Sequence, residues 1–240
     1  IFSPTNDALL TNPLSEIVPG AQVDNTKKYR IFNSLYAEVK ILEGLKYRVN
    51  FGPDFTISRW GRFVGAATNA RKLGDPQAST VNNQGFNWTL ENIVSYNKTF
   101  AQKHNFSATL LQSLQSDNFE SYRTDVQGVP AETQQFYNLG NAGSVLGVSS
   151  GLTQWTINSY MARINYDFND KYLLTATIRR DGSSRFGENT KYGNFPGIAL
   201  GWNISNEPFL KQVSWIDLLK LRAGWGKVGN QGVADRKSVV

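Results

Sequence analysis

The densest group of charged and hydroxyl side chains that could bind or react lies in the stretch Arg179–Gly187, which reads RRDGSSRFG. It places the guanidinium groups of Arg179 and Arg185 within a few residues of the Asp181 carboxylate and the Ser183 hydroxyl. Such groups bind polar partners through directed, charge-assisted hydrogen bonds. In one interpretation they bind a ligand or another part of the protein. In the other, which we favour, Arg179 pairs with a carboxylate, because an unpaired charge in an enclosed site is costly unless it is hydrated.

Three other motifs carry weaker signals of chemistry. His104 is the one histidine, so a Ser–His–Asp triad would have to use it, yet its place in a Lys-His turn predicts an exposed residue. The Gly224–Gly229 segment (GWGKVG) matches G-x-G-x-x-G, but a dinucleotide site also needs a following helix in a βαβ unit. A glycine in a strand more often lets a neighbouring backbone approach. The Asp167–Lys171 segment (DFNDK) lacks the length and closing Glu of a calcium loop and predicts a tight turn.

The composition points away from catalysis and from nucleic acid. Paired carboxylates, a metal-ligand cluster and a nucleophile–base pair are not apparent, so we expect no enzyme activity, no metal and no cofactor. The chain has no cysteine, which excludes disulfides and thiolate metal sites. Its 25 Lys and Arg residues give a net charge of +6, but they are scattered singly rather than clustered. A nucleic-acid partner is therefore not expected.

The elements that must position these side chains are β-strands. In Leu45–Ser58 every second residue from Leu45 to Ile57 is hydrophobic, and the intervening residues are polar or glycine. This period of two is the signature of a strand with one apolar face. Pro53 removes one ladder donor and predicts a bulge or bend. The preceding run 30–41 also alternates, and 42–44 joins the two as a hairpin turn in which a glycine supplies positive φ.

The same pattern repeats along the chain. We predict eight strands in four hairpins, pairing 30–41 with 45–58, 86–96 with 104–115, 155–168 with 171–181, and 195–205 with 216–228. The connections between hairpins, 59–85, 116–154 and 182–194, are long and rich in Gly, Asn, Ser and Gln. The predicted fold class is all-β, an antiparallel up-and-down meander. Alternation of short turns with long loops is typical of outer-membrane barrels and uncommon in compact soluble domains.

Alternation alone does not decide what covers the apolar face. A soluble sandwich buries it against a second sheet, whereas a membrane barrel turns it to lipid and turns the polar face to a lumen. The strand lengths suit a tilted crossing of a hydrocarbon layer, and aromatic residues near strand ends resemble membrane girdles. These aromatic residues are Tyr47, Phe55, Tyr160, Phe168, Tyr172, Trp202 and Trp225. The barrel is favoured, and a soluble glycan-binding sandwich stays the alternative. No apolar run is long enough for a transmembrane helix.

Several stretches carry a family resemblance. The segment 170–210 (DKYLLTATIRRDGSSRFGENTKYGNFPGIALGWNISNEPFL) followed by 215–231 (WIDLLKLRAGWGKVGNQ) closely resembles the barrel of the SusC/RagA family of TonB-dependent outer-membrane transporters. The upstream stretches NPLSEIV, LEGLKYRVNFGPDF, WTLENIVSYNKTF and SYMARINYDFND are similar to that family in the same order. The similarity covers roughly residues 12–231, and the block 170–196 is highly specific.

The resemblance implies a plugged barrel of about 22 strands in the bacterial outer membrane, in contact with its lipid. Such proteins import oligosaccharides or peptides with a SusD-like lipoprotein lid, powered by the inner-membrane TonB complex, and do no covalent chemistry. Eight strands do not close a barrel of that size. The TonB box and the plug are therefore expected outside this sequence, and no residue here is assigned to TonB contact.

Two sets of residues are candidates for function on this reading. Cationic side chains on the polar strand face are expected to line the lumen, where they either favour anionic substrate or complement an acidic plug: Lys46, Arg48, Arg163, Arg179, Lys220 and Arg222. Aromatic and amide side chains in the predicted long loops are expected to contact substrate or lid, or simply to pack the loops: Trp60, Phe63, Asn82, Asn83, Phe136, Tyr137 and Asn138.

The ends of the sequence carry separate expectations. The chain begins at Ile1 without a methionine or a signal peptide, which indicates a fragment or a processed chain. Residues 1–234 are expected to be one partial barrel domain. The last six residues, DRKSVV (235–240), do not continue a strand and are expected to be a non-native tail, with a divergent loop as the alternative.

Overall fold

The computed structural model describes residues 14, 16–72, 74–210 and 215–229. The strands are β1 (Gln22–Phe32), β2 (Leu35–Leu42), β3 (Leu45–Val64), β4 (Gln77–Phe100), β5 (His104–Gln127), β6 (Ser144–Phe168), β7 (Tyr172–Ser183), β8 (Tyr192–Asn203) and β9 (Lys220–Gly226). Three short 3₁₀ turns accompany them, η2 (Glu132–Gln134), η3 (Leu139–Asn141) and η4 (Ile204–Asn206). No helix among the described residues is long and apolar enough to cross a membrane. The all-β prediction is confirmed. The expected tail at 235–240 lies outside the described residues.

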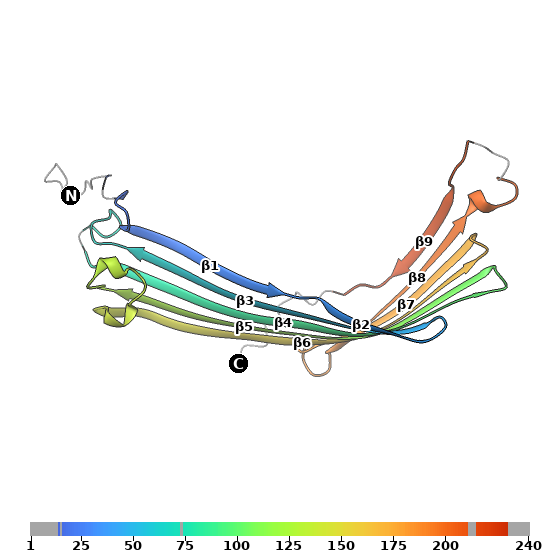
Figure 1. Cartoon of the computed structure of the whole chain (residues 1–240), viewed down its shortest axis with the longest axis horizontal. Coiled ribbons are helices and arrows are strands. Elements are labelled where there is room, and N and C mark those ends of the chain that lie inside the picture. The colour runs from blue at the N-terminus through green and yellow to red at the C-terminus, as the bar shows by residue number, and fades with distance from the viewer. Residues whose placement is uncertain (1–13, 15, 73, 211–214, 230–240) are drawn as a thin grey trace. The chain divides into compact units, whose positions relative to one another are not determined.

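The described strands form one sheet in the order β1-β3-β4-β5-β6-β7-β8-β9, with β2 also paired to β3 (Figure 1). Every pairing with a resolved register is antiparallel. The up-and-down meander is therefore confirmed. A β-sandwich needs a second sheet to cover its apolar face, and all nine described strands belong to this single sheet.

The predicted strand 30–41 is two strands, which makes the sheet nine-stranded instead of eight-stranded. β1 pairs with Asp54–Val64 and β2 with Leu45–Phe51 of the same partner, β3. The break at 33–34 lies opposite Gly52 and Pro53, and the Asn33 amide donates to the Pro53 carbonyl at 3.1 Å. Pro53 has no N–H to donate in return, so the regular ladder is interrupted there.

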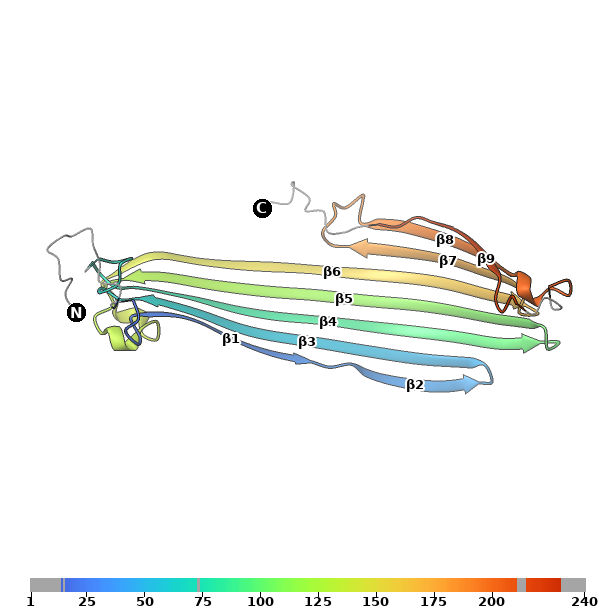
Figure 2. The same ribbon diagram turned by 90° about the horizontal axis from the view of Figure 1, so that it is seen from above.

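The predicted boundaries of three long strands are wrong. β4, β5 and β6 have 24, 24 and 25 residues, and they lie side by side in the sheet (Figure 2). The connections are correspondingly shorter than predicted, at 65–76, 128–143 and 184–191. The residues added to β4 and β5 are largely polar, and those added to β6 carry Val145, Leu146, Val148 and Leu152 without a sustained period of two, so the hydrophobic alternation that identifies a strand in sequence is missing.

Contacts divide the chain into two compact units, and strands β3 to β6 contribute residues to both. The first unit comprises residues 1–32, 54–86 and 118–154. Its core consists of Phe63, Ala78, Val126, Val129 and Phe136, which are at most 4% exposed. Phe136 comes from the segment 128–143 that connects β5 to β6. Its ring would lie only 2.4 Å from a Cβ at residue 61, which explains the glycine there.

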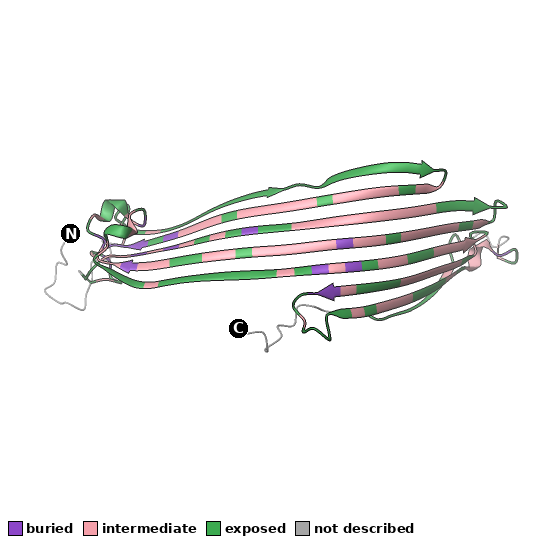
Figure 3. Cartoon of the chain, turned by 90° about the horizontal axis from the view of Figure 1, so that it is seen from below, coloured by how far each residue is buried: buried purple, intermediate pink, exposed green. Residues whose placement is uncertain are grey.

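The second unit comprises residues 33–53, 87–117 and 155–240. β6 continues into β7 through Asn169 and Asp170, which both have positive φ, so the tight turn predicted for DFNDK is confirmed. β7 then pairs with β8 along eleven residues from Tyr172 to Gly182. Most strand positions of this sheet are exposed or half-buried (Figure 3). Ile178, Ile198 and Leu200 of the second unit, which are between 47% and 57% exposed, therefore lack the cover that Phe136 provides for Phe63 in the first.

Candidate functional site

The register of the second unit assigns each side chain of β6, β7 and β8 to one of two faces, because directly paired residues share a face. Thr177 of β7 pairs with Arg163 of β6 and with Gly197 of β8. Ile178, the next residue, pairs with Ala162 and Pro196. One face of these strands is therefore polar and cationic, and the other is hydrophobic.

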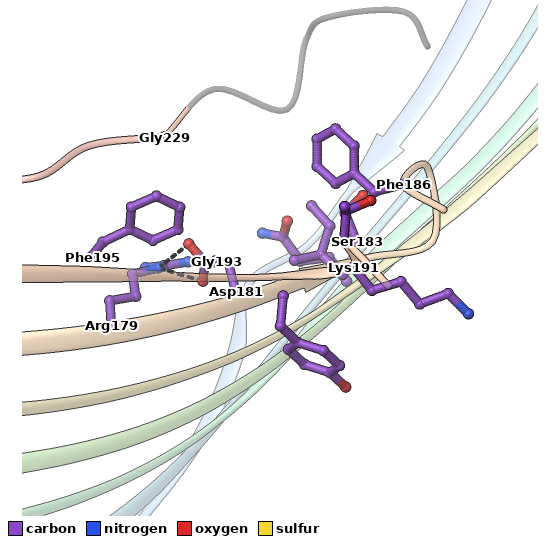
Figure 4. Close-up of a pocket in the computed structure, with 12 residues that line it drawn as sticks. Arg179, Asp181, Ser183, Phe186, Lys191, Gly193, Phe195 and Gly229 are labelled. Carbon is purple, nitrogen blue, oxygen red and sulfur yellow. Dashed lines mark hydrogen bonds and ion pairs between the residues drawn. The ribbon is translucent and has the colours of Figure 1, made fainter. Parts of the chain in front are cut away.

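A cavity of about 370 Å³ lies on the polar face, around the RRDGSSRFG stretch (Figure 4). Its lining comes from β5 to β8, from the connection between β7 and β8, and from the segment that follows β9. The residues are Gln115, Ile157, Arg179, Asp181, Ser183, Phe186, Thr190, Lys191, Tyr192, Gly193, Phe195 and Gly229. All of them belong to the second unit.

Arg179 is held in this cavity by polar partners. Its Nε donates to both carboxylate oxygens of Asp181, at 2.7 and 2.9 Å, and its Nη2 donates to the Ser159 hydroxyl at 3.2 Å. The pairing with a carboxylate that we favoured from sequence is present, and the carboxylate is Asp181 of the same strand. Ser159 is almost fully buried, so this contact helps to fix the direction of the guanidinium.

Phe195 supplies the hydrophobic wall of the cavity. It pairs directly with Arg179, and its ring lies where a Cβ at residue 193 or 229 would stand, at 2.7 and 2.3 Å. The glycines of the Gly224–Gly229 motif thus allow neighbouring groups to come close to the backbone. Gly226 pairs with Gly197 between β9 and β8, and Gly229 lies beside the Phe195 ring. The cavity therefore offers an ion pair, hydroxyl groups and the aromatic side chains of Phe186, Tyr192 and Phe195, a set suited to binding a polar ligand.

The six cationic candidates lie on four strands and do not form one cluster. Lys46 of β3 bonds to Glu38 at 2.9 Å, and Arg48 lies over the Tyr36 ring at 4.1 Å. Arg163 of β6 lies on the polar face opposite Thr177. Lys220 and Arg222 of β9 pair with Asn203 and Gly201, and so share the face of Ala199 and Gly197. Whether these cations meet substrate stays a prediction.

Four of the predicted loop residues lie in strands, so that assignment is wrong. Trp60 and Phe63 belong to β3, and Asn82 and Asn83 to β4. Two of them form hydrogen bonds with side chains of neighbouring strands: Trp60 Nε1 donates to Asp24 at 2.7 Å, and Asn83 Nδ2 donates to Ser58 at 3.3 Å. Phe63 is fully buried in the core of the first unit. Strand register, which the sequence does not display, decides these contacts.

Phe136, Tyr137 and Asn138 do lie in the connecting segment 128–143. Phe136 is buried in the core of the first unit, as the packing alternative expected, whereas Tyr137 is 60% exposed. The two rings lie 4.6 Å apart, and the Arg59 guanidinium lies 4.7 Å from the Tyr137 ring. Of these three residues, Tyr137 presents the exposed aromatic surface.

Sequence reasoning missed a polar group of the first unit around Trp60. Arg123 of β5 lies 5.7 Å from the Trp60 ring and bonds to Asp125 at 2.7 Å. Asp125 also accepts from the Ser79 hydroxyl at 2.6 Å. The alternation of Arg123 and Asp125 with Tyr122 and Thr124 was a signal, but it falls in a stretch predicted to be a loop. This group resembles the cavity of the second unit in joining an Arg–Asp pair to an aromatic ring.

The tight-turn end of the second unit holds a compact knot of hydrogen bonds around Glu207. Its carboxylate accepts from Lys171 Nζ and Tyr172 OH, both at 2.8 Å, and from Trp202 Nε1 at 3.2 Å. These donors lower the pKa of Glu207 from its ordinary 4.5 to about 2, with the Lys171 hydrogen bond as the largest cause. Glu207 is 7% exposed. The knot ties the turn before β7 to the turn after β8.

His104 is not the exposed turn residue that we predicted. It begins β5 and is half-buried, with its ring 4.8 Å from the Phe168 ring. Its Nδ1 lies 2.7 Å from the Tyr166 hydroxyl. Tyr166 and Phe168 of β6 therefore shield His104, which the turn sequence alone had predicted to be exposed to solvent.

Comparison with known proteins gives relatives over most of the chain. It is 35% identical over 230 residues to TonB-dependent receptor P39 of Formosa agariphila, which covers 95% of this chain and 22% of the relative. It is 32% identical to TonB-dependent receptor P26 of that organism, with 95% and 23% covered. It is 49% identical over 83 residues to TonB-dependent receptor SusC of Bacteroides thetaiotaomicron, with 35% and 8% covered. The chain spans less than a quarter of the length of these relatives.

Solved structures give the same fold. A chain of the RagAB peptide transporter superposes with a TM-score of 0.83 at 18% identity, covering 92% of this chain and 24% of that one. The RagAB peptide importer in its open-open state gives 0.80 at 17% identity, with 89% and 23% covered. At these identities the likeness concerns the fold alone. No model of a protein family matches the chain.

Proposed function

Because this chain is a segment of the β-barrel of a SusC/RagA-like TonB-dependent receptor of the outer membrane, we propose that its parent protein imports oligosaccharides or peptides. The expectation that the chain is no enzyme is confirmed, since its relatives are receptors and transporters. The parent is then a closed barrel of about 22 strands, to which this segment contributes a stretch of wall.

The observation that carries the proposal is the contrast between the two faces of the second unit. Ile164, Ile178, Ile198 and Leu200 are between 44% and 57% exposed and share the apolar face. A contiguous hydrophobic surface of this kind is unfavourable in water and marks a contact with a membrane or another protein. In a barrel it faces lipid, while Arg163, Thr177 and Arg179 face the conduit.

The proposed partners follow from the relatives. A transporter of this kind works with a SusD-like lipoprotein that closes the conduit and with the TonB complex, which acts through regions outside this chain. The structural neighbour RagAB is a peptide transporter, which supports peptides beside oligosaccharides as cargo for this chain's parent. The basic wall formed by Arg163, Lys220 and Arg222 either favours anionic cargo or complements an acidic plug.

The test is deletion of the parent gene in its host, followed by growth on defined oligosaccharide or peptide mixtures. We expect growth to fail on one class and to stay normal on monosaccharides and free amino acids, with recovery when the full-length gene is restored. Equal growth of both strains on every mixture would overturn the proposed import. Recovery of the full-length protein without detergent, as a soluble glycan-binding monomer, would support the sandwich alternative instead.

A further inference from the structure

One arginine of the second unit lies on the hydrophobic face. Arg180 of β7 pairs directly with Tyr160 of β6 and Asn194 of β8. It continues the line of Leu174, Ala176 and Ile178 rather than that of Arg179, because successive residues of a strand point to opposite faces. Its side chain is exposed. A cation has therefore been placed on the face that meets lipid.

The position of Arg180 along the strand corresponds to one edge of the hydrophobic band. Phe168, Tyr172 and Trp202, which are paired in turn across β6, β7 and β8, mark the other edge near the tight turn. Arg180 lies eight residues beyond Tyr172, which is about 26 Å along a strand and about 20 Å of height at the usual tilt. The band of a membrane barrel is about 25 Å tall, so a long side chain at Arg180 reaches the headgroup level.

Arg180 differs from its neighbour Arg179 in its partners. The ion pairs among the residues that the structure describes involve Arg30, Lys46, Arg123, Lys171 and Arg179, and none includes Arg180. The guanidinium of Arg180 lies instead 4.8 Å from the centre of the Tyr192 ring. A ring face stabilises a cation but supplies no countercharge. On a lipid-facing surface an anionic headgroup can supply that countercharge.

A groove on the same face ends at Arg180. Its volume is about 580 Å³, and hydrophobic side chains make most of its lining, among them Val94, Leu110, Ala162 and Ile178. Ala162 of β6 pairs with Ile178 and is the smallest of these side chains. At the far side Asn92 donates to Gln112 at 2.7 Å and accepts from Tyr47 at 2.6 Å. Those polar groups satisfy one another, which leaves Arg180 and Asn194 as the polar end of the groove.

We propose that this groove holds a phosphate-bearing anionic membrane lipid, with its phosphate on the Arg180 guanidinium and an acyl chain over Ala162. The charge, the aromatic support of Tyr192, the headgroup-level position and the hydrophobic floor all match such a lipid. Guanidinium groups bind phosphate oxygens in a bidentate manner, and the amide of Asn194 adds a donor beside them. The site lies on the opposite face from the conduit, so it is separate from cargo binding.

The test uses the full-length parent, delipidated in a neutral detergent and titrated with phosphatidylglycerol or with phosphatidylcholine while bound lipid is counted by native mass spectrometry. We expect Arg180→Gln to weaken phosphatidylglycerol binding about five-fold, the factor for one basic residue at an anionic surface. Arg180→Lys should retain most of the binding. Ala162→Phe, which fills the groove and keeps the charge, should weaken it as well. Arg179→Gln, on the other face, is the matched control and should leave it unchanged.

Three outcomes would overturn the lipid site. They are unchanged phosphatidylglycerol binding in both Arg180→Gln and Ala162→Phe, an equal loss in Arg179→Gln, and an equal affinity of the unmodified protein for phosphatidylcholine. The heat-dependent gel shift of a folded barrel checks that each variant has folded. If Arg180→Gln fails this check, lipid binding by Ala162→Phe and Arg180→Lys still tests the proposed site. Lipid binding is measured without cargo, so a failure here leaves the proposed import untouched.

Discussion

The first unit buries Phe63 and Val126 under its own connecting segment, whereas the second unit leaves Ile198 and Leu200 uncovered. Phe63 is 0% exposed and Leu200 is 57% exposed, although both belong to strands of one sheet. A hydrophobic side chain in water is costly at either position. Protein covers Phe63 and Val126 in the first unit, and in the proposed barrel lipid covers Ile198 and Leu200 in the second. The comparison teaches that one sheet can combine a locally packed core with an uncovered hydrophobic face that needs a partner outside the chain.

The largest effect that tests this contrast is expected from Phe63→Ala in the full-length parent. We expect it to lower the free energy of unfolding by about 3–5 kcal/mol, because it leaves a cavity among tightly packed side chains. Phe51→Ala is the matched control from the same strand, since Phe51 is 37% exposed and belongs to the second unit. Denaturant unfolding in detergent or lipid measures both. Equal losses at the two positions would mean that Phe51 is also covered by protein, and the contrast between the units would fail.

The next test compares the effect of the same charge on the two faces of β8. Ile198→Arg puts a charge on the apolar face of β8, four residues from Trp202 and so close to the bilayer midplane, and should cost about 2–4 kcal/mol. Ala199→Arg puts the same charge on the polar face, opposite Thr175 and Gly224, and should cost much less. The yield of folded, heat-modifiable barrel in the outer membrane is the measurement. A larger loss for Ala199→Arg would reverse our assignment of the two faces.

Much of the second unit could be predicted from the sequence, because its strands alternate between hydrophobic and polar residues. Leu45–Ser58 and the hairpin around Asn169 were placed correctly in this way. The first unit was harder, since Asn82 and Asn83 extend β4 with polar residues on both faces. There only the backbone hydrogen bonds to neighbouring strands define β4, and a single sequence does not reveal which strands are the neighbours.

The candidate sites divide in the same manner. Alternation assigned Arg179 to the polar face, and the carboxylate expected beside it is present two residues away. The group of Asp24, Trp60 and Arg123 could not be foreseen, because it joins three strands that are far apart in sequence. The environment of Arg180 was equally hidden, since its contact with the Tyr192 ring and its lack of a carboxylate partner among the described residues depend on three-dimensional neighbours.

A smaller effect is expected from pH at the Glu207 knot. The folded-state pKa of Glu207 is lowered to about 2 from 4.5, so its contribution to stability is complete above pH 4.5 and is lost as the pH falls toward 2. Unfolding of the full-length parent between pH 7 and pH 2.5 should therefore show a decline that is smaller in Glu207→Gln. Glu188→Gln, in the exposed connection between β7 and β8, is the control and should keep the decline. A Glu207→Gln variant with the full decline would show that other carboxylates produce it.

The smallest effect on stability is expected at Tyr137, the exposed ring that lies beside the buried Phe136. Removing it in Tyr137→Ala gives up one exposed cation–π contact with Arg59, which is worth about 0.5–1 kcal/mol. Phe136→Ala should instead cost about 3–5 kcal/mol, because that ring fills the core. If Tyr137 contacts cargo or lid, its removal should weaken that binding several-fold in the full-length parent while the barrel stays stable, as titration calorimetry with purified cargo or lipoprotein can measure. A loss of stability as large as that of Phe136→Ala would instead make Tyr137 part of the packing, because an exposed binding residue can be truncated without disturbing the core beneath it.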